Sequence, residues 1–445
     1  MYTVVLSIFF LTFLVISLIG FKKESTILSF VLADKNRSTT LLATSIFASV
    51  LGASATVGVV DLAYKVGVPA IWWLLSGSIG LIICGALLGE KIVANNCFTL
   101  TGLVELYFGA IPKKIVALIV YVGWIGVVAA QFIAAALLVS TLTNIPYKAV
   151  VIVISFYILL LCLIGGQKII LKSDFIQFFI IIIGLIGVAL YLWIFKKDIS
   201  STTIPISFAP INENFKIESV LHYLVVVGSG FVIGPDIFSR LFSAKDKRVA
   251  KRAPIVAAIC LFFINIFIVS IGLWAKKNAL KIEGTNNTLY YIMNNYLPSL
   301  LKLILAITML STILSSANTC IISASTIFAS DFLEQKKVAT IRISAIALST
   351  FAILIGLFNS NIISLLLISY SLFNIGVVPP LFVALLISPK RKIYPVAGVV
   401  ALLCGASCGL LSNLLHKPLI ALCGFILSFL LSAISYKTEN LPLKE

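Results

Sequence analysis

The sequence predicts an all-α membrane protein with many spanning helices, and three observations carry this prediction. Of 445 residues, 60% are hydrophobic and only 11% are charged, whereas a soluble domain has about 45–50% apolar and about 25% charged residues. The apolar residues form continuous runs of the length that a spanning helix needs, without the apolar–polar alternation of a membrane β-strand. Short basic loops separate the runs. A soluble enzyme and a β-barrel are therefore excluded.

Thirteen apolar runs of spanning length follow one another along the chain. The first has no basic residue before it and no cleavage site of small residues, and Lys22 and Lys23 follow it, so we expect a retained helix and not a signal peptide. The runs cover about residues 2–21, 40–64, 69–89, 115–141, 147–165, 173–195, 219–235, 253–275, 300–330, 340–357, 362–388, 393–412 and 417–436.

The basic residues predict how the chain is oriented in the membrane. Of the 33 lysines and arginines, 23 fall in one alternating set of loops, which includes the basic segment from Arg240 to Arg252. Because basic loops stay on the cytoplasmic side, we expect the N-terminus outside and the C-terminus in the cytoplasm, in a multi-pass protein of the plasma (inner) membrane. An odd number of spans agrees with this. The net charge of +17 then reflects orientation and not nucleic-acid binding.

The second run is unusually rich in small residues. Eleven of the sixteen residues in segment 43–58 are Ala, Gly, Ser or Thr. Such a face allows another helix to approach closely, and Gly52 and Gly58 also favour local unwinding. A tight helix–helix contact and an interrupted helix both remain open at this point.

The seventh run ends in the sequence Gly228-Ser-Gly-Phe-Val-Ile-Gly-Pro235. Three glycines and a proline within eight residues favour a broken helix. This run lies five runs after the second. Transporters built from inverted repeats carry an interrupted helix at the corresponding position of each half, with the binding site between them. The pair of runs therefore predicts a transport site near the middle of the membrane.

Hydroxyl side chains recur every four residues on the ninth run, at Ser311, Ser315, Thr319 and Ser323. Each hydroxyl could bond the carbonyl one turn back along its own helix. Alternatively, the hydroxyls form a row of oxygens that, with the carbonyls of an unwound helix, replaces the water around a small cation.

Asp174 is the most conspicuous charged residue close to an apolar run. A carboxylate near membrane depth is costly and is by default a functional candidate. The alternative is an acid at a helix N-terminus, stabilised by the helix dipole with Ser173 as the cap. No P-loop pattern and no long loop is present in the sequence, which argues against transport driven directly by ATP.

Four segments together resemble the sodium:solute symporter family. They are Ala48–Gly58 with Ala63-Tyr-Lys-Val-Gly67, Ser173-Asp-Phe-Ile-Gln177, Pro235-Asp-Ile-Phe-Ser-Arg240 with Ala244-Lys-Asp-Lys247, and Ser315-Ser316 followed sixteen residues later by Asp331. They occur in the family's order from about residue 40 to 390. The resemblance implies a five-plus-five inverted repeat of the leucine-transporter type.

The implied repeat divides the chain into four parts. Residues 1–39 would form one extra N-terminal helix and a cytoplasmic loop, residues 40–195 the first repeat (core helices one to five) and residues 196–390 the second repeat (core helices six to ten). Residues 391–445 would form two extra C-terminal helices and a short cytoplasmic tail.

The resemblance also implies a sodium site between core helices one and eight. The carbonyls of Ala48, Leu51 and Thr312 and the hydroxyls of Ser315 and Ser316 match its ligands. Ser311 and Thr312 offer a competing hydroxyl pair one turn earlier. Asp174 matches an acid that some members use near a second sodium ion or on a proton path.

The implied substrate positions depart from the known patterns of the family. Sugar-binding members carry polar groups where this chain has Ser54 and Ala55, and proline-type members carry aromatic groups where it has Val227 and Phe231. Polar groups on the third and tenth core helices could line a midplane pocket or bond neighbouring helices. The five candidates for a substrate pocket are Ser54, Gln131, Phe231, Tyr370 and Asn374.

Together with the resemblance, these expectations imply that the protein is a sodium-coupled secondary active symporter and not an enzyme. It would import a small organic solute by alternating access, with sodium as the coupling ion, the lipid bilayer as its environment, no nucleic-acid ligand and no obligate protein partner evident. Two alternatives remain: a proton-coupled transporter of the same fold, and a solute receptor or sensor that binds without net transport.

Overall fold

The structure is a computed structural model that describes residues 2–19, 27–95, 97–196, 207–282, 287–358, 362–386, 395–415 and 417–434. These residues form helices and loops and contain no β-strand. Nine of their helices are long and apolar enough to cross a membrane, or ten if one bent pair counts as a single span, and two shorter apolar helices accompany them. The prediction of an all-α protein with many membrane-spanning helices is confirmed.

The first half of the chain contains the first bent helix and the longest helices. Its elements are α1 (Tyr2–Ile19), α2 (Ile27–Leu32), η1 (Ala33–Lys35), α3 (Thr39–Val50), η2 (Ser54–Gly58), α4 (Val59–Val66), η3 (Val68–Ile71), α5 (Trp72–Ile83), η4 (Cys84–Leu88), α6 (Gly89–Ala94), α7 (Leu100–Phe108), α8 (Ala110–Thr143) and α9 (Tyr147–Phe195).

Helix α9 covers two predicted runs, 147–165 and 173–195. A kink separates them at Gly166, where the backbone has φ 54° and ψ −179°. Side chains disfavour a positive φ and glycine does not, so glycine at this position lets the chain turn between the two helical parts.

The second half contains the second broken helix. Its elements are α10 (Ile217–Tyr223), η5 (Leu224–Gly228), α11 (Ser229–Val232), α12 (Pro235–Leu241), α13 (Lys247–Lys277), α14 (Thr288–Tyr296), α15 (Ser299–Ile327), η6 (Phe328–Phe332), α16 (Val338–Phe358), α17 (Ile362–Gly376), α18 (Val378–Leu386), α19 (Pro395–Leu414) and α20 (Pro418–Ile434).

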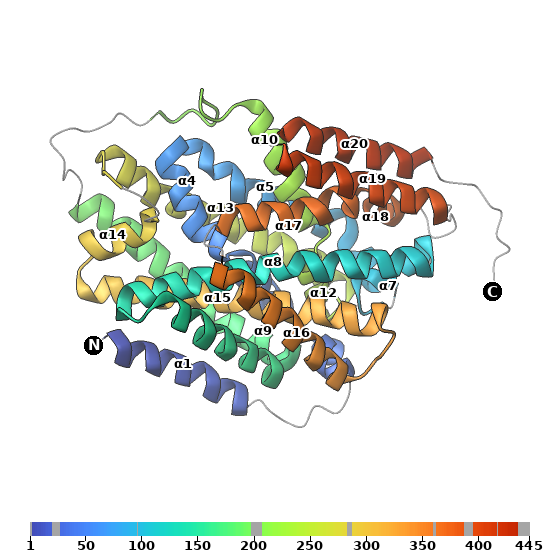
Figure 1. Cartoon of the computed structure of the whole chain (residues 1–445), viewed down its shortest axis with the longest axis horizontal. Helices are drawn as coiled ribbons and strands as arrows, with labels where there is room; N and C mark the ends of the chain where they lie inside the picture. The colour runs from blue at the N-terminus through green and yellow to red at the C-terminus, as the bar shows by residue number, and fades with distance from the viewer. Residues whose placement is uncertain are drawn as a thin grey trace.

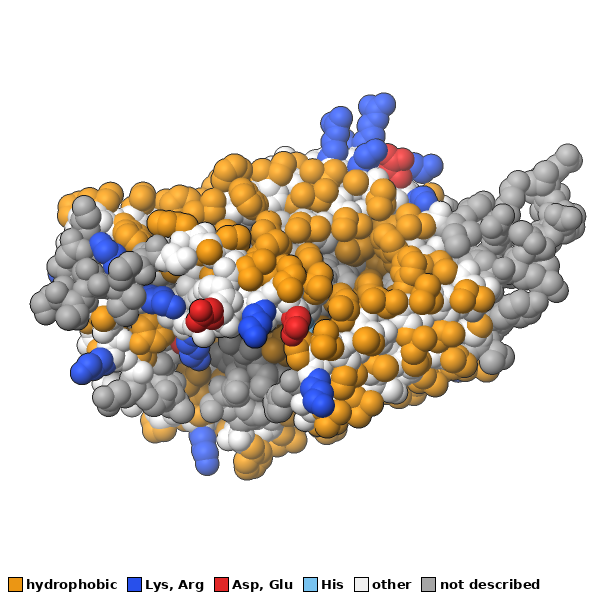
Figure 2. All heavy atoms as spheres, turned by 90° about the horizontal axis from the view of Figure 1, so that it is seen from above, with side chains coloured by type: hydrophobic (Ala, Val, Ile, Leu, Met, Phe, Trp, Pro, Cys, Tyr) orange, Lys and Arg blue, Asp and Glu red, His pale blue; other side chains and the backbone are white. Residues whose placement is uncertain are grey.

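The helices form one bundle around α8 and α15. Figure 1 shows these two helices in the middle, α1 along one edge, and α19 and α20 side by side along the opposite edge. Helix α15 packs against α9, α8 and α3, and α17 packs against α8 and α19. Hydrophobic side chains cover most of the face in Figure 2, and the lysines and arginines gather in a few groups. This is the surface expected of a protein in contact with lipid.

Both predicted helix interruptions are present. Helix α3 stops at Val50, and the helical segment that resumes at Ser54 is bent by 63° from it. In the second half, α11 ends at Val232. Ile233 and Gly234 have non-helical backbones, and Pro235 begins α12. Proline has no backbone N–H to donate to a carbonyl of the preceding turn, so the helix is interrupted before Pro235. The π-helical segments beside the two breaks, η2 and η5, both pack against α17.

One basic residue does not lie where the loop pattern places it. Arg240 belongs by sequence to the basic loop 240–252, but its side chain is fully buried on α12. Its neighbours in sequence, from Lys245 to Arg248, are exposed as expected. Arg240 is buried because a buried carboxylate on another helix binds it, as described below.

Candidate functional site

Helices α3 and α15 meet where α3 ends. The hydroxyl of Ser316 donates a hydrogen bond to the backbone carbonyl of Ser49 at 2.6 Å. A Cβ atom on Gly52 would lie 2.9 Å from Ser316 Oγ and 2.6 Å from Gln131 Nε2. Only glycine leaves room for both side chains, so the small-residue face of the second run serves a close helix contact and an interruption together.

The break leaves backbone oxygens of α3 available. Among the described residues, no backbone hydrogen bond reaches the carbonyls of Ala48 and Leu51, and both residues are fully buried. An unpaired buried carbonyl is costly unless a partner satisfies it. A cation is such a partner, because carbonyls of unwound helices coordinate Na⁺ in transporters.

The three candidate ligands on α15 are also buried. Ser315 donates its hydroxyl hydrogen to Asp174 Oδ1 at 2.6 Å, as Ser316 does to Ser49. A hydroxyl that has donated its hydrogen still presents two lone pairs, so these bonds leave both oxygens able to bind a cation. The donor set is made of oxygens alone and suits a hard cation.

The competing hydroxyl pair differs in its bonding. Thr312 Oγ1 donates to the carbonyl of Met309, one turn back along its own helix, at 2.7 Å. Ser311 Oγ is buried and has no partner among the described residues. Neither hydroxyl forms a bond to α3 or to Asp174, whereas Ser315 and Ser316 form one each.

Asp174 lies at the centre of a buried network that joins four helices. Its carboxylate accepts hydrogen bonds from Ser45 on α3 and Ser315 on α15, and Arg240 Nη2 on α12 lies 3.1 Å from Asp174 Oδ2. Arg240 also donates to Ser45 Oγ at 2.8 Å and to Thr319. Both charged side chains have no exposed surface. The guanidinium therefore already supplies one positive charge to this carboxylate.

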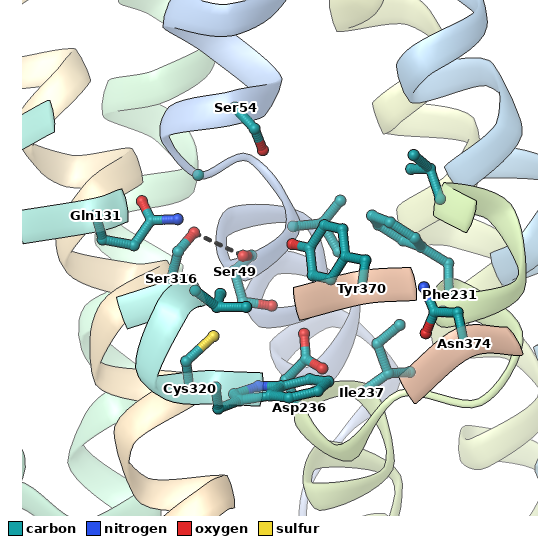
Figure 3. Close-up of a pocket in the computed structure, with 16 residues that line it drawn as sticks. Ser49, Ser54, Gln131, Phe231, Asp236, Ile237, Ser316, Cys320, Tyr370 and Asn374 are labelled. Atoms are coloured by element: carbon teal, nitrogen blue, oxygen red, sulfur yellow. Dashed lines mark hydrogen bonds between the residues drawn. The ribbon is translucent and has the colours of Figure 1, made fainter. Parts of the chain in front are cut away.

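A cavity of about 40 Å³ lies beside the α3–α15 contact, and Figure 3 shows the residues around it. A water molecule needs about 10–15 Å³ on this measure, so the cavity has room for about three. The five candidates for a substrate pocket all line it: Ser54, Gln131, Phe231, Tyr370 and Asn374. They come from η2, α8, α11 and α17, so the cavity lies between the two broken helices.

Two of these candidates also support the broken helices. Gln131 Oε1 accepts a hydrogen bond from the backbone N–H of Ala53 at 2.9 Å, just after the break in α3. Asn374 Nδ2 donates to the carbonyl of Val226 in η5 at 2.5 Å. Interhelical bonding and a place in the cavity wall, which the sequence left as alternatives, therefore hold together for both side chains.

Sequence reasoning missed several residues of the cavity wall. Ser49, Trp124, Cys320 and Asp236 line it, and Figure 3 shows the Asp236 carboxylate directed toward the space between Ser49 and Tyr370. One signal could have found Asp236, because it directly follows the Gly234-Pro235 break. An acid at the interruption of a spanning helix is a functional candidate.

Comparisons with known proteins give one family match and similar solved structures. The profile of the sodium:solute symporter family matches residues 30–389, and no curated protein sequence matches the chain. A solved structure of a Na⁺-coupled sialic acid symporter, in a substrate-bound outward-open state, superposes with a TM-score of 0.82 at 15% identity, covering 99% of both chains. MhsT in complex with L-phenylalanine superposes with a TM-score of 0.56 at 14% identity, covering 89% of this chain and 98% of that one.

Proposed function

Because the chain belongs to the sodium:solute symporter family, we propose that it is a sodium-coupled secondary active symporter that imports a small organic solute by alternating access. Thirteen spanning helices would form a five-plus-five inverted repeat. Residues 40–195 and 196–390 are its halves, one extra helix lies in residues 1–39 and two in residues 391–445. The N-terminus lies outside the cell membrane and the C-terminus in the cytoplasm.

The observation that carries this proposal is the oxygen-lined contact between α3 and α15. The carbonyls of Ala48 and Leu51 lack backbone partners at the break, and Ser316 reaches across to Ser49 at that point. We assign Na⁺ to this contact, with the carbonyls of Ala48, Leu51 and Thr312 and the hydroxyls of Ser315 and Ser316 as its ligands. The ion would hold α3 and α15 together while solute binds in the neighbouring cavity.

The same contact supplies the coupling. Ser49 and Ser316 belong to the α3–α15 contact and also line the cavity, so an ion that orders them also shapes the solute pocket. Coupling between two ligands is reciprocal, and each should therefore tighten the binding of the other. One positive charge moving down a membrane potential releases about 2.3 kcal/mol per 100 mV, which drives roughly fifty-fold accumulation.

Asp174 connects the ion site to Arg240. By accepting the Ser315 hydrogen at 2.6 Å, it fixes the orientation of a proposed ligand. A second sodium ion or a proton would bind Asp174 when Arg240 withdraws from it. A proton-coupled cycle would use this route, and its rate would follow pH at fixed sodium.

The test of the ion site replaces both hydroxyls, as Ser315→Ala with Ser316→Ala. We expect the sodium concentration for half-maximal thermal stabilisation of the purified protein to rise by at least about tenfold, because two of five oxygens are lost. The sodium concentration is varied while potassium is added to keep the ionic strength constant. The matched control is Thr350→Ala, which removes an exposed hydroxyl that bonds only within α16.

An unchanged sodium response in the double variant would refute the ion site. A wild-type protein that responds equally to sodium and potassium would refute sodium coupling itself. Flux into proteoliposomes then separates a transporter from a receptor that binds without net transport.

A further inference from the structure

The cavity wall carries one kind of charge. Sixteen residues line the cavity, and among them Asp236 is the one with a charged side chain. Its side chain forms no ion pair with any described residue. Its carboxylate is half-buried and accepts hydrogen bonds from the backbone N–H groups of Asp236 and Ile237 at the start of α12. A carboxylate that faces a cavity with no cation in direct contact is costly, so a cationic partner from outside the chain is expected.

The nearest cation is committed elsewhere. Arg240 lies one turn after Asp236 on α12, and its Nη1 donates to the backbone carbonyl of Asp236 at 3.1 Å. Its other nitrogens bond Ser45, Thr319 and the Asp174 carboxylate. Arg240 also attracts the Asp236 carboxylate from a distance, but its direct ion pair is with Asp174. One guanidinium and two carboxylates leave one net negative charge beside the cavity.

A second acceptor in the wall also lacks a partner. Asn374 is 2% exposed, and because its Nδ2 donates to Val226, its Oδ1 is fixed as the free end of the amide. No described residue donates to Asn374 Oδ1. An acceptor buried without a donor costs about 1–3 kcal/mol. A solute that brings N–H groups would satisfy it.

Three aromatic rings are also part of the wall. Phe231, Tyr370 and Trp124 line the cavity, and Figure 3 shows Phe231 and Tyr370 on the same side as Asn374. Aromatic faces attract organic cations by their negative quadrupole, and the attraction grows when water is excluded. A carboxylate, a free amide oxygen and three aromatic rings are together the lining that suits an ammonium group.

We propose that the cavity selects a solute that carries a protonated amine, bound by the Asp236 carboxylate and the Asn374 amide oxygen among the rings of Phe231, Tyr370 and Trp124. This inference rests on the proposed symport function and names its substrate class. An acid such as the sialic acid of the structural neighbour would meet the Asp236 carboxylate with a like charge. Sodium and an ammonium group lie near each other in this arrangement, and Asp236 offsets their repulsion.

The test titrates matched solutes against the purified full-length protein in sodium and in potassium, with the thermal midpoint as the readout. The cations are ethylamine, ethanolamine and putrescine; the neutral partners are ethanol, ethylene glycol and 1,4-butanediol; the anions are acetate, glycolate and succinate. Choline and N-methylglucamine are avoided as sodium substitutes because they are themselves organic cations. We expect amines alone to raise the midpoint, and to do so more strongly in sodium.

Two variants test the wall. Asp236→Asn should weaken amine binding by at least about tenfold, because a charge-assisted hydrogen bond is roughly twice as strong as a neutral one, while the sodium response without solute persists. Phe231→Leu should weaken it by a few-fold through the loss of one aromatic face. The control Glu218→Gln removes an exposed carboxylate on α10 of the same broken helix and should change nothing.

The outcomes separate this inference from the proposed function. Equal binding of neutral or anionic partners, or no binding of any amine by a protein that still responds to sodium, overturns the amine inference alone. If Asp236→Asn loses the sodium response as well, Asp236 belongs to the ion site and the inference falls. If the wild type shows no sodium response, the proposed function fails first.

Discussion

Two carboxylates near Arg240, one buried and one half-buried, have different surroundings. Asp174 on α9 is bound by Arg240, Ser45 and Ser315, all within the chain. Asp236 on α12 forms no ion pair with any described residue and lines the cavity. The first carboxylate is bound by a cation and two hydroxyls of the fold, whereas the second accepts backbone hydrogen bonds at the start of α12 and faces the cavity.

The difference indicates how to interpret acids in a membrane protein. Their position in membrane-spanning segments marks both carboxylates as functional candidates. The partners of each carboxylate indicate which role it has. A carboxylate that joins four helices holds the site in shape, whereas one that faces a cavity is available to a ligand. The following predictions test whether this division is correct.

The largest effect should come from Arg240→Met, which keeps a long side chain and removes its charge. It leaves Asp174 buried without a cation, and breaking a buried ion pair from one side costs about 3–5 kcal/mol. We expect a large fall in the thermal midpoint of the purified protein at fixed sodium. The double variant Arg240→Met with Asp174→Asn should recover most of the loss, since neither charge then remains unpaired.

This double-mutant cycle also measures the coupling between the two residues. A single variant as stable as the wild type would mean that Asp174 has another cation, or is neutral, when Arg240 is absent. Additive losses in the double variant would mean that the pair is not an energetic unit.

A smaller effect should separate the two carboxylates directly. Asp174→Asn keeps the size of the side chain but leaves Arg240 without its counter-charge. We expect a loss below that of Arg240→Met, because Arg240 keeps its hydrogen bonds to Ser45 and Thr319. Asp236→Asn removes a charge that forms no ion pair with any described residue. The stability of this variant should therefore stay within about 1 kcal/mol of the wild type. Thermal unfolding in sodium without added solute gives both values, and equal losses would remove the distinction.

Much of the fold could be predicted because its signals are local in sequence. A run of apolar residues defines a spanning helix by its length, and Gly52 and the Gly234-Pro235 pair mark breaks through their own backbone chemistry. The kink at Gly166 also lies between two predicted runs. None of these features depends on knowing which helix is the neighbour.

The site was predicted only in part, since much of it depends on contacts between distant segments. Gln131, Tyr370 and Asn374 were found because polar residues on apolar helices are rare enough to notice. Arg240 was misplaced because it opens a sequence rich in lysine and arginine, a pattern typical of a cytoplasmic loop. Its partner Asp174 lies 66 residues away in sequence, and no local pattern joins the two.

Asp236 was missed for a related reason. It stands in the motif Pro235-Asp-Ile-Phe-Ser-Arg240, which supports the family resemblance as a whole and does not by itself single out Asp236. The position of the break places Asp236 in the cavity wall, because α12 starts directly after the non-helical residues Ile233 and Gly234.

The smallest effect should come from a third acid, Asp61, which lies in the first turn of α4. Its Oδ2 is 2.7 Å from Lys65 Nζ, with Lys65 65% exposed and Asp61 16% exposed, and its Oδ1 accepts a hydrogen bond from Thr288 on α14 at 2.7 Å. Water screens a pair of this kind, and such pairs contribute about 0–1 kcal/mol. Asp61→Asn should therefore lower stability by less than about 1 kcal/mol, and Lys65→Gln by no more.

A salt series provides the control for this prediction. The loss in Asp61→Asn should shrink in high potassium chloride because salt screens exposed charges. The loss in Arg240→Met should persist there, since both members of the Arg240–Asp174 pair are buried. A sodium or amine response that changes in Asp61→Asn would show that partners inside the chain do not suffice to identify a structural acid, and the contrast between Asp174 and Asp236 would then lose its basis.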